Sequence, residues 1–413
     1  ESSPSSVSDS STLDVRLKEK GMHEPEGKTS PIAWVALISL WMLCSASSIM
    51  WLSFSVVSDI SRQWLSVDLS AVNWIANATA LMSVTEHGWL LVQSNRLNLP
   101  TWCQISYHYD RAVFDFCTTD YINYTSHYAA IPLGAAISQL AIPAICKSVE
   151  EFPRVVIVSA VYSTLAAAPF FFLPGLPKDA PSFTASSKRT PFLKACRALF
   201  KSVNFLLLMF MFSINLGLES SIVALLNPIM LPYGYTNEQA GIAGFVRLFS
   251  GFLAGAVTGP LIDRTGQHML ILRLFVPLLA FTYVMMYIQI IPNAILVVCM
   301  ACVLNGFVTL LLLPTMLEIA SEITYPVSES LSTSVLWAAA EIASFVMTLV
   351  MDLMKSGDKS TPPNNMQNAL LFAMVLACVG TIPIVFFKGK MRRLAQDINF
   401  EQVTTKDDNE IED

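Results

Sequence analysis

Residues 293–317 read NAILVVCMACVLNGFVTLLLLPTML, a run without a single charged side chain. A helix needs about 20 mostly apolar residues to cross the hydrocarbon core of a bilayer, and this run is long enough. The whole chain has the same character, because 54% of its 413 residues are hydrophobic and only 14% are charged. A soluble protein carries roughly 25% charged residues. The composition therefore predicts an all-α membrane protein instead of two or three soluble domains.

Ten apolar segments are candidate membrane spans, so this run is one of a set. The second candidate has only 11 residues (74–84) and would cross a bilayer only with help from its flanks. The ten segments are 31–57, 74–84, 128–146, 155–173, 203–230, 240–262, 270–290, 293–317, 330–354 and 369–387.

Lysines and arginines cluster in three places: before the first span, between the fourth and fifth spans, and after the last. Short basic segments mark the cytoplasmic side, and an even number of spans separates each pair of clusters. Both termini and the central linker are thus predicted to be cytoplasmic, which is the layout of a two-lobed transporter. The predicted parts are a disordered tail (1–30), an N-terminal membrane lobe (31–175), a linker (176–202), a C-terminal six-helix lobe (203–388) and a second tail (389–413).

The two predicted lobes are unequal, with four spans in the first and six in the second. Residues 86–127 are unlike the rest of the chain, being polar, aromatic and without helical periodicity. One interpretation is a long cytoplasmic insertion. The other, which we favour, is a splice variant or gene-model error that replaces the third and fourth spans of the first lobe. Losing a hairpin of two spans would leave the orientation of the later spans unchanged.

A polar turn follows the sixth apolar segment and reads GPLIDRTGQH over residues 259–268. It resembles the G-x-x-x-D-R-x-G-R-R loop of the major facilitator superfamily, with Gly259, Asp263, Arg264 and Gly266 at the motif positions. Glycine permits a tight turn, and the charged pair can bind neighbouring helix ends. His268 and the glutamine before it replace the usual basic pair, which weakens the charge. The alternative is an ordinary polar hairpin.

Residues 313–329 read LPTMLEIASEITYPVSE and resemble the end of the tenth helix in the feline leukaemia virus subgroup C receptor family. That resemblance, also seen around Trp51, implies a transporter of haem-related compounds, choline or ethanolamine, or pyridoxine. The acidic pair four residues apart shares one helix face, and we expect either an intracellular gate or a solvated helix end. The gating candidates in this run are Glu318, Glu322, Tyr325, Pro326 and Glu329.

Ionisable residues inside membrane spans are functional candidates by default. Trp337 and Glu341 lie one helical turn apart, and a tryptophan face beside a carboxylate suits an organic cation. By the resemblance, choline-transporting members use a tryptophan at Trp51 and a tyrosine where this chain has Ser220. They also use glutamines where it has Pro132 and Glu341. Glu341 could favour a protonated amine or couple transport to protons. The alternatives are packing or lipid-facing tryptophans and a structural hydrogen bond from Glu341.

Three further polar residues lie within predicted spans. Glu219 and Arg247 fall at similar depth on consecutive spans, and we interpret them as an internal ion pair because lone buried charges are costly. Gln139 is a weaker candidate for substrate binding.

Other function classes lack support in the sequence. There is no nucleophile–base pair, phosphate-binding loop or metal-binding spacing, so we expect no enzyme, no cofactor and no metal site. No basic face suggests nucleic acid, and none of the five histidines lies in a confident span as a haem ligand. We predict a monomeric transporter of a small organic solute in the plasma or an organelle membrane, working by alternating access. The alternative is a non-transporting, receptor-like or truncated isoform.

Overall fold

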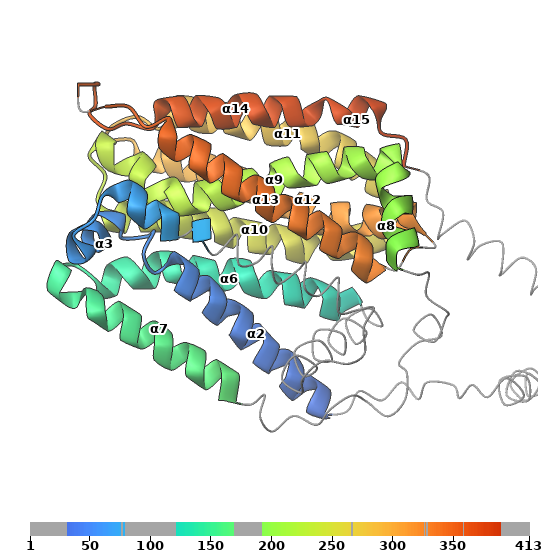
Figure 1. Ribbon diagram of the computed structural model, residues 1–413, viewed down its shortest axis with the longest axis horizontal. Helices are drawn as coiled ribbons and strands as arrows, with labels where there is room; N and C mark the ends of the chain where they lie inside the picture. The colour runs from blue at the N-terminus through green and yellow to red at the C-terminus, as the bar shows by residue number, and fades with distance from the viewer. Residues whose placement is uncertain are drawn as a thin grey trace, which may run out of the picture.

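The computed structural model describes residues 31–75, 77–78, 121–168, 192–265, 267–325, 327, 329–357 and 359–389 (Figure 1). All regular elements within these residues are helical. The longer helices are α2 (Pro31–Leu52), α3 (Ser58–Leu65), α6 (Tyr121–Ile145), α7 (Phe152–Ala167), α8 (Phe192–Lys201), α9 (Val203–Met230), α10 (Asn237–Thr265), α11 (His268–Gln289), α12 (Ile295–Thr324), α13 (Glu329–Leu353) and α14 (Gln367–Thr381), with the short α15 (Pro383–Phe386) after them.

Six helices in the described residues are long and apolar enough to cross a membrane, and they are α9 to α14. They fall on the last six segments predicted from the sequence. Helix α12 continues past the apolar span, which was predicted to end at residue 317, and its last polar turns carry Glu318 and Glu322 up to Thr324. Two shorter apolar helical stretches belong to α2 and α6. The predicted span 74–84 lies mostly outside the described residues.

The first half of the chain departs from the sequence prediction in two places. Helix α2 ends at Leu52, and residues 53–57 form turns before α3, whereas a span to residue 57 was predicted. Residues 121–127, part of the segment predicted to lack helical periodicity, form the start of α6. The first ten residues of α6 contain neither glycine nor proline, so nothing there interrupts a helix. Residues 86–120 lie outside the described part.

The helices run side by side in one bundle with two groups (Figure 1). We call α2, α6 and α7 the first-half helices and α9 to α14 the second-half helices. Within the second half, α9 packs against α13 and α10 against α12. Helix α6 packs against α10 and so joins the two groups, while α2 packs on α6 and α7.

Helix α8 runs across the bundle at the end where α9 begins (Figure 1). We call this the α8 end, and the opposite end, where α9 finishes near α3, the α3 end. At the α8 end, Asn204 Nδ2 donates to the carbonyl of Lys388 at 2.8 Å, which ties the start of α9 to the segment after α15.

Candidate functional site

A cavity of about 300 Å³ lies between the first-half and second-half helices. Helices α2 and α6 supply one side, and α9, α10, α12 and α13 supply the other. The cavity is bounded by both halves, which is where a two-lobed transporter places its substrate site. Among the lining residues are Cys44, Ser48, Trp51, Glu219, Ser220, Trp337 and Glu341.

One face of α13 lines the cavity over nearly three turns. Trp337, Glu341, Ser344 and Thr348 all border it. Their spacings of four, three and four residues place them on one side of a helix. The ring of Trp337 is held by an edge contact with Phe212 of α9, with the ring centroids 5.9 Å apart. The same face therefore combines an aromatic surface, a carboxyl group and two hydroxyl groups.

Glu341 is the second carboxyl group that lines the cavity. Its side chain is half-buried, and within the described residues no hydrogen bond or ion pair joins it to another residue. The structural hydrogen bond weighed from the sequence is not seen there. An ionised carboxylate in such surroundings is costly unless a cation balances it.

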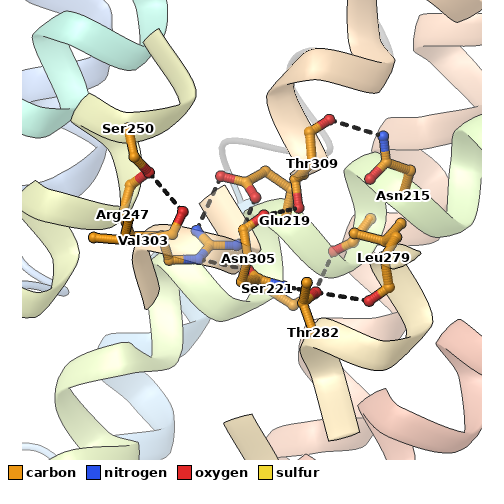
Figure 2. Close-up of polar contacts among 11 residues, drawn as sticks. Asn215, Glu219, Ser221, Arg247, Ser250, Leu279, Thr282, Val303, Asn305 and Thr309 are labelled. Carbon is orange, nitrogen blue, oxygen red and sulfur yellow. Dashed lines mark hydrogen bonds and ion pairs between the residues drawn. The ribbon is translucent and has the colours of Figure 1, made fainter. Parts of the chain in front are cut away.

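Glu219, by contrast, is fully paired beside the cavity. Arg247 Nη1 donates to Glu219 Oε1 at 3.0 Å and Nη2 to Oε2 at 2.5 Å (Figure 2). The exposed fraction of Arg247 is 0% and that of Glu219 is 7%. The structure thus joins the two residues interpreted as an internal ion pair, and Arg247 neutralises Glu219.

A polar network continues from this ion pair through the second half. Asn305 Oδ1 accepts from Arg247 Nε at 2.9 Å, and Asn305 Nδ2 donates to Thr282 Oγ1 at 2.9 Å (Figure 2). The network thereby links α9, α10, α11 and α12. Sequence reasoning missed Asn305, although an amide inside the apolar run 293–317 is a visible signal.

The structure separates Gln139 from the other substrate-binding candidates. Its side chain is buried in the contact between α6 and α10. A Cβ placed on Gly241 or Gly244 of α10 would collide with Gln139, so these glycines make room for it. Gln139 is absent from the cavity lining, whereas Trp51, Ser220, Trp337 and Glu341 all border it.

The motif after the sixth apolar segment differs from the expected loop. Gly259, Asp263 and Arg264 belong to the last turns of α10, which continues to Thr265, and their side chains lie outside the described part. Gly266 is outside it as well.

Helix α11 begins next, and His268 Nε2 lies 3.2 Å from Glu318 Oε1 at the end of α12. Glu318 therefore contacts the start of a neighbouring helix, and its part in an intracellular gate stays a prediction.

The other gating candidates lie at the turn between α12 and α13. Glu322 is half-buried in the last turn of α12, and Tyr325 follows that helix with 39% of its surface exposed. Pro326 lies outside the described residues. Glu329 is the first residue of α13, and its side chain is not described.

Three polar contacts join the two halves at the α3 end. Ser58 Oγ donates to Asn227 Oδ1 at 2.7 Å. Asn73 Nδ2 donates to Asp352 Oδ1 at 2.6 Å, and Lys147 Nζ lies 3.2 Å from Glu238 Oε1. We call these pairs the α3-end contacts. Their partners lie far apart in sequence, so no local pattern predicts them.

Comparison with known proteins relates this arrangement to a family. Residues 124–348, more than half of the chain, match the Major Facilitator Superfamily. A bacterial homologue of the human lysosomal transporter Spinster, crystallised in an inward-facing and occupied conformation, has a TM-score of 0.56. Its identity is 10%, over 87% of this chain and 97% of the homologue, which supports the fold alone.

Similar sequences include several transporters. Solute carrier family 49 member A3 of Xenopus tropicalis is 22% identical over 89% of this chain and 89% of its own length. The choline/ethanolamine transporter FLVCR2 of Homo sapiens is 24% identical over 66% of this chain and 53% of its own. An uncharacterized protein of Caenorhabditis elegans is 24% identical over 64% and 56%. The chain thus spans about half the length of the last two relatives. These matches agree with the family resemblance seen in the sequence.

Proposed function

The chain belongs to the Major Facilitator Superfamily, and on that premise we propose that it transports a small organic cation, preferably a protonated amine, by alternating access. The observation that carries this proposal is the unpaired carboxylate of Glu341 beside Trp51 and Trp337 in the cavity between the two halves. The six helices in the described residues that are long and apolar enough to cross a membrane, together with the family assignment, establish an integral, multi-pass membrane protein.

Charge selects the substrate class. Glu219 is neutralised by Arg247, so Glu341 is the carboxyl group in the cavity that no described protein cation neutralises. A monocation beside Glu341 would restore neutrality in a low dielectric. The two tryptophans add favourable cation–π surface.

Size also bears on the substrate. A volume of about 300 Å³ lies at the lower limit of ligand pockets in proteins. It suits a small amine or a single-ring vitamin better than a porphyrin macrocycle. Among the solutes weighed from the sequence, this volume favours the amine over haem.

Three positions separate this chain from the choline-transporting pattern that the resemblance implies, and one is Pro132 in the cavity lining, where that pattern has a glutamine. Ser220 stands where that pattern has a tyrosine, which reduces the aromatic cage around a quaternary ammonium. Glu341 stands where it has a glutamine, and a carboxylate accepts hydrogen bonds from N–H donors more strongly than an amide does. Ethanolamine carries such donors on its nitrogen and choline does not. We therefore expect ethanolamine to be preferred.

The conformational cycle follows from the α3-end contacts. They hold the halves together at the α3 end, so substrate would reach the cavity from the α8 end, predicted to be cytoplasmic. Opening the α3 end would require the pairs Ser58–Asn227 and Asn73–Asp352 to separate. Alternation between these two arrangements would open the cavity first to one side of the membrane and then to the other.

Uptake into proteoliposomes tests this function. We expect saturable uptake of labelled ethanolamine, weaker uptake of choline, and a large loss with Glu341→Gln. The matched control Glu150→Gln changes an exposed carboxylate outside the cavity lining and should leave uptake unchanged. Failure of the folded protein to transport ethanolamine, choline or pyridoxine would contradict the proposal.

A second candidate function is a non-transporting or truncated isoform. The alignment with the Xenopus relative runs over 436 positions, more than the 413 residues of this chain, so the relative has segments that this chain lacks. Sequencing transcripts across residues 86–127 distinguishes the two. A transcript that restores two apolar spans in this interval would support the truncated isoform.

A further inference from the structure

Helix α8 carries a basic face at the end of the bundle. Lys194, Arg197 and Lys201 are spaced by three and four residues, which places them on one side of the helix. All three are exposed, and α8 contains no acidic residue. In the described residues none of the three forms an ion pair, so their charges are available to an external partner.

The opposite face of α8 is fixed to the protein. Ala195 and Leu199 are buried in the same hydrophobic cluster as the residues of α9. Cys196 lies half-buried beside them, and burial raises the pKa of its thiol, so it remains neutral. The basic face therefore points away from the bundle and is held in a fixed position.

The depth of α8 follows from the length of α9. Helix α9 has 28 residues and is therefore about 42 Å long, at 1.5 Å per residue. The hydrocarbon core is about 30 Å thick, or 40–45 Å with the headgroup layers. The ends of α9 thus reach the headgroups, and α8 lies across one of those ends, separated from α9 only by Ser202 (Figure 1).

A second segment at the same level has matching chemistry. The carbonyl of Lys388 is bonded to Asn204, which places Lys388 near the start of α9 and beside α8. Lys388 is exposed, and Phe386 just before it is 66% exposed. In α8, Phe200 is 53% exposed next to Lys201. Each segment pairs a basic side chain with an exposed aromatic ring, the combination found where proteins meet a membrane interface.

We propose that this basic face (Lys194, Arg197 and Lys201, with Lys388 beside it) binds the headgroups of anionic phospholipids at the membrane surface. Phe200 and Phe386 would rest in the boundary between headgroups and acyl chains. The positive charge of this face complements the phosphate and carboxylate groups of such headgroups. The depth of α8 in the membrane favours lipid, and not a soluble anion, as the bound molecule. The interaction would fix the linker between the two halves against the membrane.

The magnitude follows from the number of charges. Each lysine or arginine near an anionic surface strengthens binding by roughly fivefold, so neutralising three should weaken it on the order of 100-fold.

The test uses the full chain in nanodiscs of phosphatidylcholine with or without phosphatidylserine. Native mass spectrometry counts the retained phosphatidylserine, and hydrogen exchange reports protection of residues 192–201. The test variant is Lys194→Gln/Arg197→Gln/Lys201→Gln. The control is Arg154→Gln/Lys355→Gln/Lys359→Gln, which removes three charges at the α3 end. Thermal melting of both variants verifies the fold.

We expect phosphatidylserine to be retained by the wild type and the control and lost from the α8 variant. Protection of α8 should rise only when phosphatidylserine is present. Equal retention by the α8 variant would overturn the proposal. The same degree of α8 protection with and without phosphatidylserine would overturn it too, because the charge of the lipid would then have no effect on the basic face.

Discussion

Replacing Glu219 by glutamine should cost more stability than any surface charge change in this protein. The substitution leaves Arg247 fully buried with a positive charge and no counter-ion. Glutamine can still accept one hydrogen bond from the guanidinium, and Asn305 still accepts from Nε. What is lost is one charge-assisted bond and the neutralising charge itself.

The size of the effect can be worked out from these contacts. Breaking a buried ion pair by removing one partner costs about 3–5 kcal/mol. Every 1.4 kcal/mol is a factor of ten, so the ratio of folded to unfolded protein should fall roughly 100- to 4000-fold. The exposed pair Glu151–Arg154 offers a matched comparison, since such pairs contribute about 0–1 kcal/mol.

Equilibrium unfolding of the purified protein in detergent measures both variants. Glu219→Gln should lose several kcal/mol and Glu151→Gln at most about 1 kcal/mol. The double variant Glu219→Gln/Arg247→Leu should recover part of the loss, because the orphaned charge is removed with its partner. Equal losses for Glu219→Gln and Glu151→Gln would refute the reasoning, as would a double variant less stable than Glu219→Gln alone.

Three other predictions concern the halves and the cavity. Asp352→Leu removes the acceptor of Asn73 and should favour opening at the α3 end. A thiol reagent added on that side should then label the cavity residue Cys44 faster than in the wild type, and an unchanged labelling rate would contradict this prediction. Gly306→Leu should destabilise the α10–α12 contact by about 1–3 kcal/mol or more, because even a Cβ at this position collides with the backbone of Arg247. An unchanged melting temperature would contradict this prediction. Bound ethanolamine should protect Cys44 from the same reagent in the wild type but not in Glu341→Gln, and equal protection in both would count against the cavity as the site.

The second half of the fold was readable from the sequence because its apolar runs are long and separated by clear breaks. Helix α12 covers most of the run at residues 293–317, and its polar end at Thr324 agrees with the helix end expected from residues 313–329. Trp337 and Glu341 could be paired from helical spacing alone, since four residues make about one turn. Trp51 and Ser220 entered through the family resemblance, and the structure places all four around one cavity.

Other features depend on contacts that local sequence does not encode. Gln139 looked like a binding residue because it is polar within a span, but glycines on α10 form the space that holds it. Asn73 and Asp352 are 279 residues apart and meet only after the halves pack. Asn305 was visible as a polar residue in an apolar run, yet its partner Arg247 could be identified only from the packing of α10 against α12.

In the proposed function, Glu341 supplies the charge that recognises a cationic substrate. Equilibrium binding of labelled ethanolamine to the purified wild type and to Glu341→Gln tests it most directly. Losing a charge-assisted hydrogen bond of about 1.5–3 kcal/mol should weaken binding by roughly 10- to 150-fold without lowering the melting temperature of the free protein. Equal affinity of ethanolamine for the two proteins would contradict the claim.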